Sequence, residues 1–218
     1  GSTGDLHDVT ITTHPNKPYA SPIRAQHAAN PYLGNVTING GGTHQGTGIA
    51  MTNNAAMYIY GVVTIEGTQS GLQAESGSSV SVRSASGGVN ITTSDNGFAI
   101  QLTGADMHFF GGYPSAPALT LNGNNVGVQI FHGSRLYMQS PLLLAGDVRF
   151  TVEASNVSVV PTNGAGVLTA DNVTDYFYCR GLSTVTLRQL GDTIWDESEI
   201  DNGNTCLSTE EWQAWASQ

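Results

Sequence analysis

Apolar and polar residues alternate in short runs along most of this chain, and glycine or asparagine closes each run. Similar copies of one pattern begin at Gly48, Gly71, Gly97 and Gly127, at steps of 23, 26 and 30 residues. In each copy two alternating runs follow the glycine and a third, such as NVTIN or ALTLN, precedes it. Alternation with a period of two is the pattern of a β-strand that buries one face. Each copy therefore predicts three short strands separated by turns.

One copy cannot bury its apolar residues alone, but stacked copies share a continuous core. The repeat therefore predicts an all-β protein, a right-handed parallel β-helix of about six rungs. A sandwich or barrel of antiparallel strands is the alternative, but it does not explain why residue types recur at equivalent places. The expected inward residues are Ile49, Met51, Leu72, Ala74, Phe98, Ile100, Val128 and Ile130 on the first strand, Met57, Ile59, Val80, Val82, Met107, Phe109, Leu136 and Met138 on the second, and Val36, Ile38, Val63, Ile65, Val89, Ile91, Leu119 and Leu121 on the third.

The two ends of the chain depart from the repeat. Residues 1–34 contain four prolines and no copy of the pattern, so we interpret them as an N-terminal connector with one strand at DVTITTH. The β-helix is expected at 35–187, and a C-terminal cap segment at 188–218. In this segment an acidic turn precedes LSTEEWQAWASQ, a short helix in which Ser208 and Glu211 form a capping box. The helix either covers the last rung with Trp212 and Trp215 or binds a partner.

Once the inward residues are assigned, the outward residues of the second strand form an aromatic stripe. Rings on successive rungs lie ~4.8 Å apart, so they make a ladder. The third strand presents small polar residues instead, such as Thr64 and Asn90. The stripe is expected to comprise Tyr58, Tyr60, Arg83, His108, Phe110 and Tyr137, with Phe131 added from the first strand of a neighbouring rung.

An exposed row of rings needs a cause. A subunit interface is one, because aromatic residues are enriched there. A carbohydrate site is another, because tyrosine offers a flat apolar face to the C–H side of a sugar and a phenol to its hydroxyls. Alternatively, a loop or the connector covers the stripe. The sequence leaves all three open.

The charge balance argues against two classes of partner. The chain has seven basic and 17 acidic residues, a net charge of −10. Nucleic acids and anionic membranes attract basic surfaces, and no apolar run is long enough to span a bilayer. We therefore expect neither nucleic acid binding nor membrane insertion. We interpret Gly1–Ser2 as a cloning remnant, so a missing leader does not indicate the compartment.

Groups for catalysis or metal binding are sparse. Glycoside cleavage uses two carboxyl groups ~5–9.5 Å apart, and Glu75 and Asp106 are the candidate acids, with His108 close to the second. No two acids recur at one position in consecutive rungs, and no nucleophile, phosphate-binding or dinucleotide motif is present. Cys179 and Cys206 are too few for a zinc site, and they form either two buried thiols or a disulfide that fixes the C-terminal segment. We expect no metal and no cofactor.

The segment NGNNVGVQIFHGSRLYMQS resembles the β-helical segments of bacteriophage tailspikes and tail fibres, and is also similar to the passengers of bacterial autotransporter adhesins. The resemblance covers the fold of residues 35–187 and assigns no residue roles. Phage members are usually homotrimers that bind host surface glycans, and some cleave them. Autotransporter passengers are monomeric and adhesive.

The resemblance and the stripe together predict a non-catalytic receptor-binding or adhesive domain of a phage tail fibre or tailspike. It would form a homotrimer on the virion and bind bacterial cell-surface polysaccharide. The alternatives are a glycan depolymerase, a hydrolase or lyase that uses Glu75 or Asp106, and an extracellular adhesin of the autotransporter type. A structural spacer without a glycan site is the third possibility.

Overall fold

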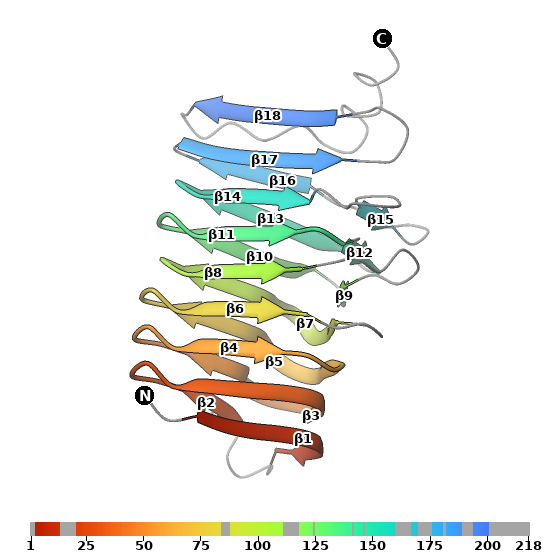
Figure 1. Ribbon diagram of the computed structural model, residues 1–218. Helices are drawn as coiled ribbons and strands as arrows, with labels where there is room; N and C mark the ends of the chain where they lie inside the picture. The colour runs from red at the N-terminus through yellow and green to blue at the C-terminus, as the bar shows by residue number, and fades with distance from the viewer. Residues whose placement is uncertain are drawn as a thin grey trace.

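The structure is a computed structural model, and it describes residues 3–13, 21–83, 88–110, 118–123, 125–140, 142–145, 147–159, 167–169, 176–180, 182–188 and 194–200. In this part of the chain every regular element is a β-strand, and the strands form one sheet that winds into a solenoid (Figure 1). The prediction of an all-β parallel β-helix is confirmed. The same residues contain no helix long and apolar enough to cross a membrane.

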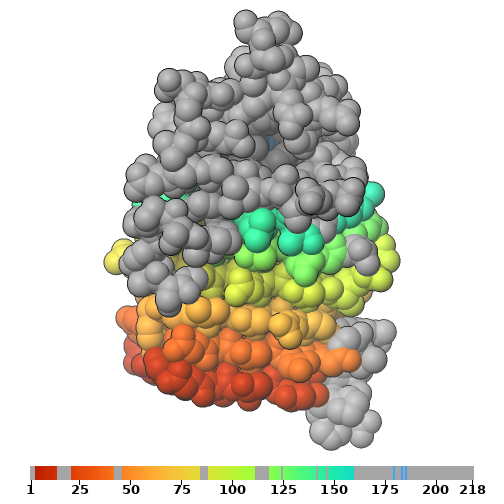
Figure 2. Space-filling view, turned by 90° about the vertical axis from the view of Figure 1, so that its right-hand side faces the viewer, coloured from red at the N-terminus to blue at the C-terminus, as the bar shows by residue number. Residues whose placement is uncertain are grey.

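The strands stack in three columns, and each column pairs in parallel from one turn to the next. Figure 2 looks onto the side of β9, β12 and β15, where the layers follow one another in chain order. The first column comprises β2 (Ile23–Ala25), the C-terminal parts of β3 (Asn30–Met51), β5 (Val63–Glu75) and β7 (Val89–Thr103), then β10 (Val126–Phe131), β13 (Val148–Glu153) and β16 (Tyr176–Arg180). The second comprises β4 (Ala56–Ile59), β6 (Ser79–Val82), β8 (Asp106–Phe109), β11 (Arg135–Met138), β14 (Asn156–Val159) and β17 (Leu182–Arg188). The third comprises the C-terminal part of β1 (Thr3–Thr12), residues 36–39 of β3, the N-terminal parts of β5 and β7, then β9 (Leu119–Asn122), β12 (Leu142–Leu144) and β15 (Val167–Thr169). Residues 3–7 of β1 and 30–34 of β3 instead begin the second column.

The core is the column of inward side chains that the alternation predicts. Every expected inward residue except Phe98 is buried, and Phe109 and Phe150 are the largest of the core side chains. In parallel register, like residues stack on like, so that Met107 lies between Val80 and Leu136. Each turn thus buries its apolar face against the turns above and below it.

Phe98 is half-buried because the first strand of its turn begins two residues later than the glycine spacing indicates. Leu72 pairs with Ile100, and Ile100 pairs with Val128. Phe98 instead lies opposite Gly127, and its Cδ1 is 2.7 Å from the position that a Cβ on Gly127 would take. The pairing shifts register next to both residues, as a β-bulge does. Gly97 is therefore a corner residue rather than the start of the strand.

The corner between the first and second columns uses residues with positive φ. Asn54 (φ 59°), Gly77 (φ 76°) and Gly133 (φ 78°) occupy it in different turns. Asparagine and glycine adopt this left-handed conformation at lower cost than other residues. Glycine and asparagine therefore mark this corner, although Ser76 (φ 54°) and His132 (φ 57°) adopt the same conformation there.

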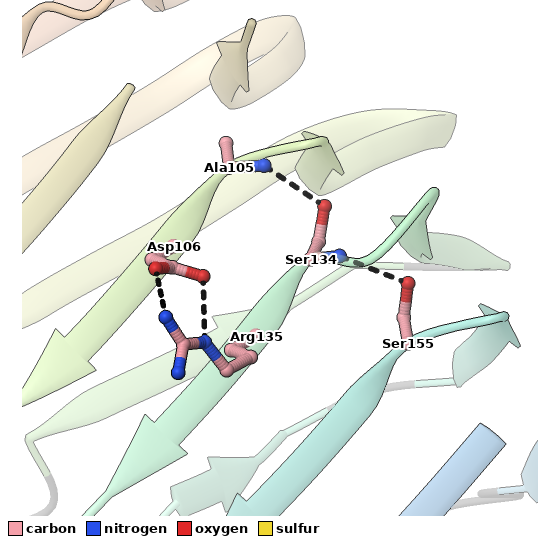
Figure 3. Close-up of polar contacts among 5 residues, drawn as sticks. All are labelled: Ala105, Asp106, Ser134, Arg135 and Ser155. Atoms are coloured by element: carbon pink, nitrogen blue, oxygen red, sulfur yellow. Dashed lines mark hydrogen bonds and ion pairs between the residues drawn. The ribbon is translucent and has the colours of Figure 1, made fainter. Parts of the chain in front are cut away.

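Buried serines follow the same corner and link one turn to the next. Ser134 Oγ donates to the carbonyl of Phe131 and accepts from the Ala105 N–H at 3.1 Å (Figure 3). The Ser134 N–H in turn donates to Ser155 Oγ at 3.1 Å. These hydroxyls pair polar backbone groups that would otherwise be buried without partners.

The repeat extends into the segment that we expected to be a connector. The strand expected at DVTITTH is present within β1, which pairs with β3 from Thr3 to Thr12. The short β2 pairs with residues 49–51 of β3. The sequence did not reveal β2 or the N-terminal half of β1, because neither segment carries a regular run of alternating apolar residues. Residues 14–20 of this segment lie outside the described residues.

The C-terminal side ends in an antiparallel pair instead of the expected acidic turn. β18 (Ile194–Ile200) runs antiparallel to β17, with Glu197 opposite Val185. The predicted helix from Ser208 lies outside the described residues, as does Cys206. Several corners do too, so the count of six rungs stays a prediction, as do the domain boundaries.

Candidate functional site

The outward side chains of β4, β6, β8 and β11, with the residue that follows each strand, form the candidate site together with His7 of β1 and Tyr32 of β3. We call this surface the ring face. Its first row consists of Tyr32, Tyr58, Ser81, His108 and Tyr137, which are paired in register from strand to strand. Its second row consists of Tyr60, Arg83, Phe110 and Gln139, whose backbone N–H groups continue the same ladder. The alternation fixes this placement, because Met107 and Phe109 face the core while His108 and Phe110 face outward.

The N-terminal half of the ring face holds two stacked ring pairs, which we call the lower cluster. Tyr32 and Tyr58 stack with centroids 5.1 Å apart and planes 17° apart, and His7 and Tyr60 stack at 5.7 Å and 24°. Tyr32, Tyr58 and Tyr60 are 42%, 38% and 39% exposed, and they are the exposed large apolar side chains of the described residues. The rings are therefore open to a ligand.

The carboxylates of Asp5 and Asp8 contact Tyr60 and His7 of the lower cluster. Tyr60 Oη donates to Asp5 at 2.8 Å, and this hydrogen bond raises the pKa of the Tyr60 phenol. Asn35 Nδ2 donates to Asp8 at 2.9 Å and lowers the pKa of that carboxyl group. His7 Nδ1 lies 2.5 Å from Asp8 Oδ2. These contacts fix the Tyr60 ring toward the N-terminal end of the solenoid.

The C-terminal half of the ring face holds a second group of rings, which we call the upper cluster. The half-buried His108 meets Phe110 and Tyr137 edge-on, with centroids 5.8 and 6.0 Å away. The Arg83 guanidinium lies over the Phe110 ring, 4.8 Å from its centroid, in cation–π geometry. Phe110 is thus an outward ring, packed under an arginine.

Phe131 does not join the ring face, contrary to our expectation. It ends β10 in the first column, where its register partners are Thr103 and Glu153. Its ring neighbour is His132, at a centroid distance of 6.1 Å. The corner from Phe131 to Ser134 separates it from Tyr137, so it belongs to another side of the solenoid.

The two candidate acids are engaged in other contacts and lie on different sides. Asp106 accepts two hydrogen bonds from Arg135, at 3.1 Å from Nε and 2.7 Å from Nη2 (Figure 3). Glu75 ends a first-column strand and accepts from Gln73 Nε2 at 2.6 Å. His108 contacts the rings of Phe110 and Tyr137, and no hydrogen bond between described residues joins it to Asp106. The structure therefore does not bring these acids together.

An amide ladder on the first column is a feature that the sequence reasoning missed. Gln73, Gln101 and Gln129 occupy one register column, and Gln101 Nε2 donates to Gln129 Oε1 at 2.9 Å. Its sequence signal is glutamine at an equivalent position in three copies. The reasoning also missed Tyr32 and His7, because both lie in the segment assigned to the connector.

The described residues contain no group of three or more histidine, cysteine, aspartate or glutamate side chains placed to hold a metal ion. Cys179 is disulfide-bonded. This favours the disulfide over the free thiol, and the chain's other cysteine is Cys206.

Comparison with protein-family models, with curated proteins and with solved structures finds no match to this chain.

Proposed function

We propose that this protein is a non-catalytic carbohydrate-binding domain that holds bacterial surface polysaccharide on its ring face. The observation that carries the proposal is the stacked, solvent-exposed set of Tyr32, Tyr58 and Tyr60, continued by His108 and Tyr137. A run of apolar rings on a surface calls for a ligand or partner.

The physical properties of the face suit a sugar chain. Tyrosine supplies a large contact area at low conformational entropy cost, and its phenol can exchange hydrogen bonds with hydroxyl groups. The rings are attached to paired strands with a buried core behind them, so their spacing is fixed before binding. Preorganisation of this kind lowers the cost of association.

The acids argue for binding rather than cleavage. A glycosidase needs two carboxyl groups ~5–9.5 Å apart across the scissile bond. Asp106 is held by Arg135, and Glu75 lies on another column of strands. Asp106 and Glu75 therefore do not form a carboxyl pair on the ring face.

The finer architecture belongs to the same proposal. We expect six right-handed rungs, as parallel crossovers are nearly always right-handed, with the helix from Ser208 as a cap. By its likeness to phage tail proteins, we place the chain in a homotrimeric tail fibre or tailspike on the virion. A monomeric extracellular adhesin of the autotransporter type is the alternative.

A binding assay against a panel of bacterial surface polysaccharides tests the proposal. The variant Tyr58→Ala/Tyr60→Ala/Tyr137→Ala is expected to lose binding while circular dichroism shows a folded β-protein. The control Thr37→Ala/Thr64→Ala/Thr120→Ala, on the third column, should bind like the wild type. Unchanged binding by the tyrosine variant would place the site elsewhere. Release of reducing ends or unsaturated sugars would show a depolymerase instead.

A further inference from the structure

The two clusters of the ring face are separated by a gap at Ser81. In the first row of the ring face Ser81 lies between Tyr58 and His108, so this row lacks a ring at one position. Tyr58 and His108 are two strand spacings apart, roughly 9–10 Å. By contrast, Tyr32 and Tyr58 on adjacent strands stack at 5.1 Å. The first row therefore lacks one ring between those of Tyr58 and His108.

The contacts on both sides of the gap point away from it. Tyr58 stacks on Tyr32, and Tyr60 stacks on His7 with its phenol on Asp5, all toward the N-terminal end. Arg83 packs over Phe110, toward the C-terminal end. Among the described residues, no ring contact joins the lower cluster to the upper cluster. The gap thus continues between Tyr60 and Arg83 in the second row of the ring face.

Arg83 places a positive charge beside this gap. It is exposed, and no ion pair of the described residues joins it to a carboxylate. The other charged residues of β4, β6, β8 and β11 are Asp106 and Arg135, which form a bidentate pair. Arg83 is therefore the positive charge in the middle of the ring face, between Asp5 and Asp8 at the N-terminal edge and the Asp106–Arg135 pair.

We infer that the gap at Ser81 is a subsite for a carboxylate-bearing sugar, such as a uronic or sialic acid residue of the polysaccharide. This inference rests on the proposed function and names its ligand class. The sugar ring packs between Tyr58 and His108, about one strand spacing from each. Its carboxylate pairs with the planar fork of Arg83, which matches carboxylate geometry. Ser81 carries only a small side chain at this position, which leaves room for the sugar.

The inference is tested by calorimetry with three sets of probes. The first is a panel of bacterial polysaccharides that contain uronic or sialic acid. The second is the same panel after chemical reduction of the carboxyl groups to alcohols, and the third is a sulfated dextran. The acidic panel is expected to contain binders that weaken roughly 10- to 100-fold on reduction, the range for loss of a charge-assisted pair. Binding should also weaken as salt rises, since Arg83 is exposed.

Matched variants connect the effect to the gap. Arg83→Gln should reproduce the loss seen on carboxyl reduction, and Arg83→Lys should fall between, because lysine keeps the charge but not the fork. Ser81→Tyr should abolish binding by filling the gap. Two control variants should bind like the wild type. Arg24→Gln removes an exposed arginine of β2, and Ser158→Tyr adds a ring on β14, where Ser158 continues the first row beyond Tyr137.

Equal binding of acidic and reduced polysaccharides, with loss only in the tyrosine variant, would overturn the acidic subsite and leave the proposed function standing. Preference for the sulfated dextran would overturn it as well. Failure of every polysaccharide to bind would overturn both proposals.

Discussion

Ser134 shows how a single buried hydroxyl can join two turns of the solenoid. It is fully buried, and it accepts from the Ala105 N–H while donating to the Phe131 carbonyl. Ser155 repeats the arrangement one turn later. Small polar residues fit here because the corner has room for a hydroxyl and leaves backbone groups to be paired.

Ser134→Ala is expected to lower the free energy of unfolding by about 1–3 kcal/mol, since it leaves the buried Ala105 N–H without its acceptor. Urea denaturation measures the change. Ser158→Ala, an outward serine of β14, should alter stability by less than ~0.5 kcal/mol. Equal effects of the two substitutions would show that the inner hydrogen bonds do not stabilise the fold.

The Tyr60–Asp5 contact predicts a phenol that ionises above its ordinary pKa. Asp5→Asn should move the pKa of Tyr60 back toward 10.0, as measured by the ring chemical shift against pH. The hydrogen bond needs the phenol proton, so its contribution to stability is present below the ordinary tyrosine pKa. It is lost as the pH rises through the raised value. An unchanged pKa in Asp5→Asn would contradict the contact.

At the scale of the strand, close approach between turns depends on small residues. Gly71 lies in β5, where an added Cβ would contact Ile91 and come 2.6 Å from the Ala99 carbonyl oxygen of the next turn. Backbone cannot yield as a flexible side chain can. The glycine therefore sets how closely β5 and β7 pack.

Gly71→Ala is expected to destabilise the protein by about 1–3 kcal/mol, the usual cost of overpacking a tight site. Gly4→Ala is the matched control, because a Cβ at this position of β1 meets no atom within 4 Å. The control should leave stability unchanged or raise it slightly. Thermal unfolding measures the stability of both variants. Unchanged stability of Gly71→Ala would contradict the observed register.

The strands were predictable wherever alternation was regular, and the errors came from breaks in it. Met107 and Phe109 were assigned inward and His108 and Phe110 outward from the period alone, and all four are so placed. Phe98 was misplaced because a register shift of two residues leaves no mark in composition. Phe131 was misplaced because the sequence does not show which side of the corner a strand end occupies.

The site was only partly predictable, because its geometry depends on register across turns. Tyr58, Tyr60 and Tyr137 were found from the pattern. Tyr32 and His7 were not, since β1 and the start of β3 carry few apolar residues to reveal the repeat. The gap at Ser81 appears only when neighbouring strands are aligned.

At the scale of the whole molecule, the ends of the solenoid differ. The N-terminal β1 pairs in parallel with β3, whereas β18 pairs antiparallel with β17. The parallel stacking of turns therefore stops at β18 within the described residues.

The proposed homotrimer predicts a mass near 68 kDa, three times the 22.8 kDa chain. Light scattering after size exclusion measures it, with and without reductant. A mass of one chain would contradict the trimer and support the adhesin alternative. In a trimer, glycan should be sought where the ring face borders the grooves between chains.

The most direct test is a titration of isotope-labelled protein with a polysaccharide that it binds, followed by nuclear magnetic resonance. The account predicts shifts in the ring signals of Tyr32, Tyr58, Tyr60 and Tyr137. The side-chain amide signals of Gln73, Gln101 and Gln129, on another side of the solenoid, should stay in place. Movement of the glutamine signals with unmoved tyrosine rings would contradict a glycan site on the ring face.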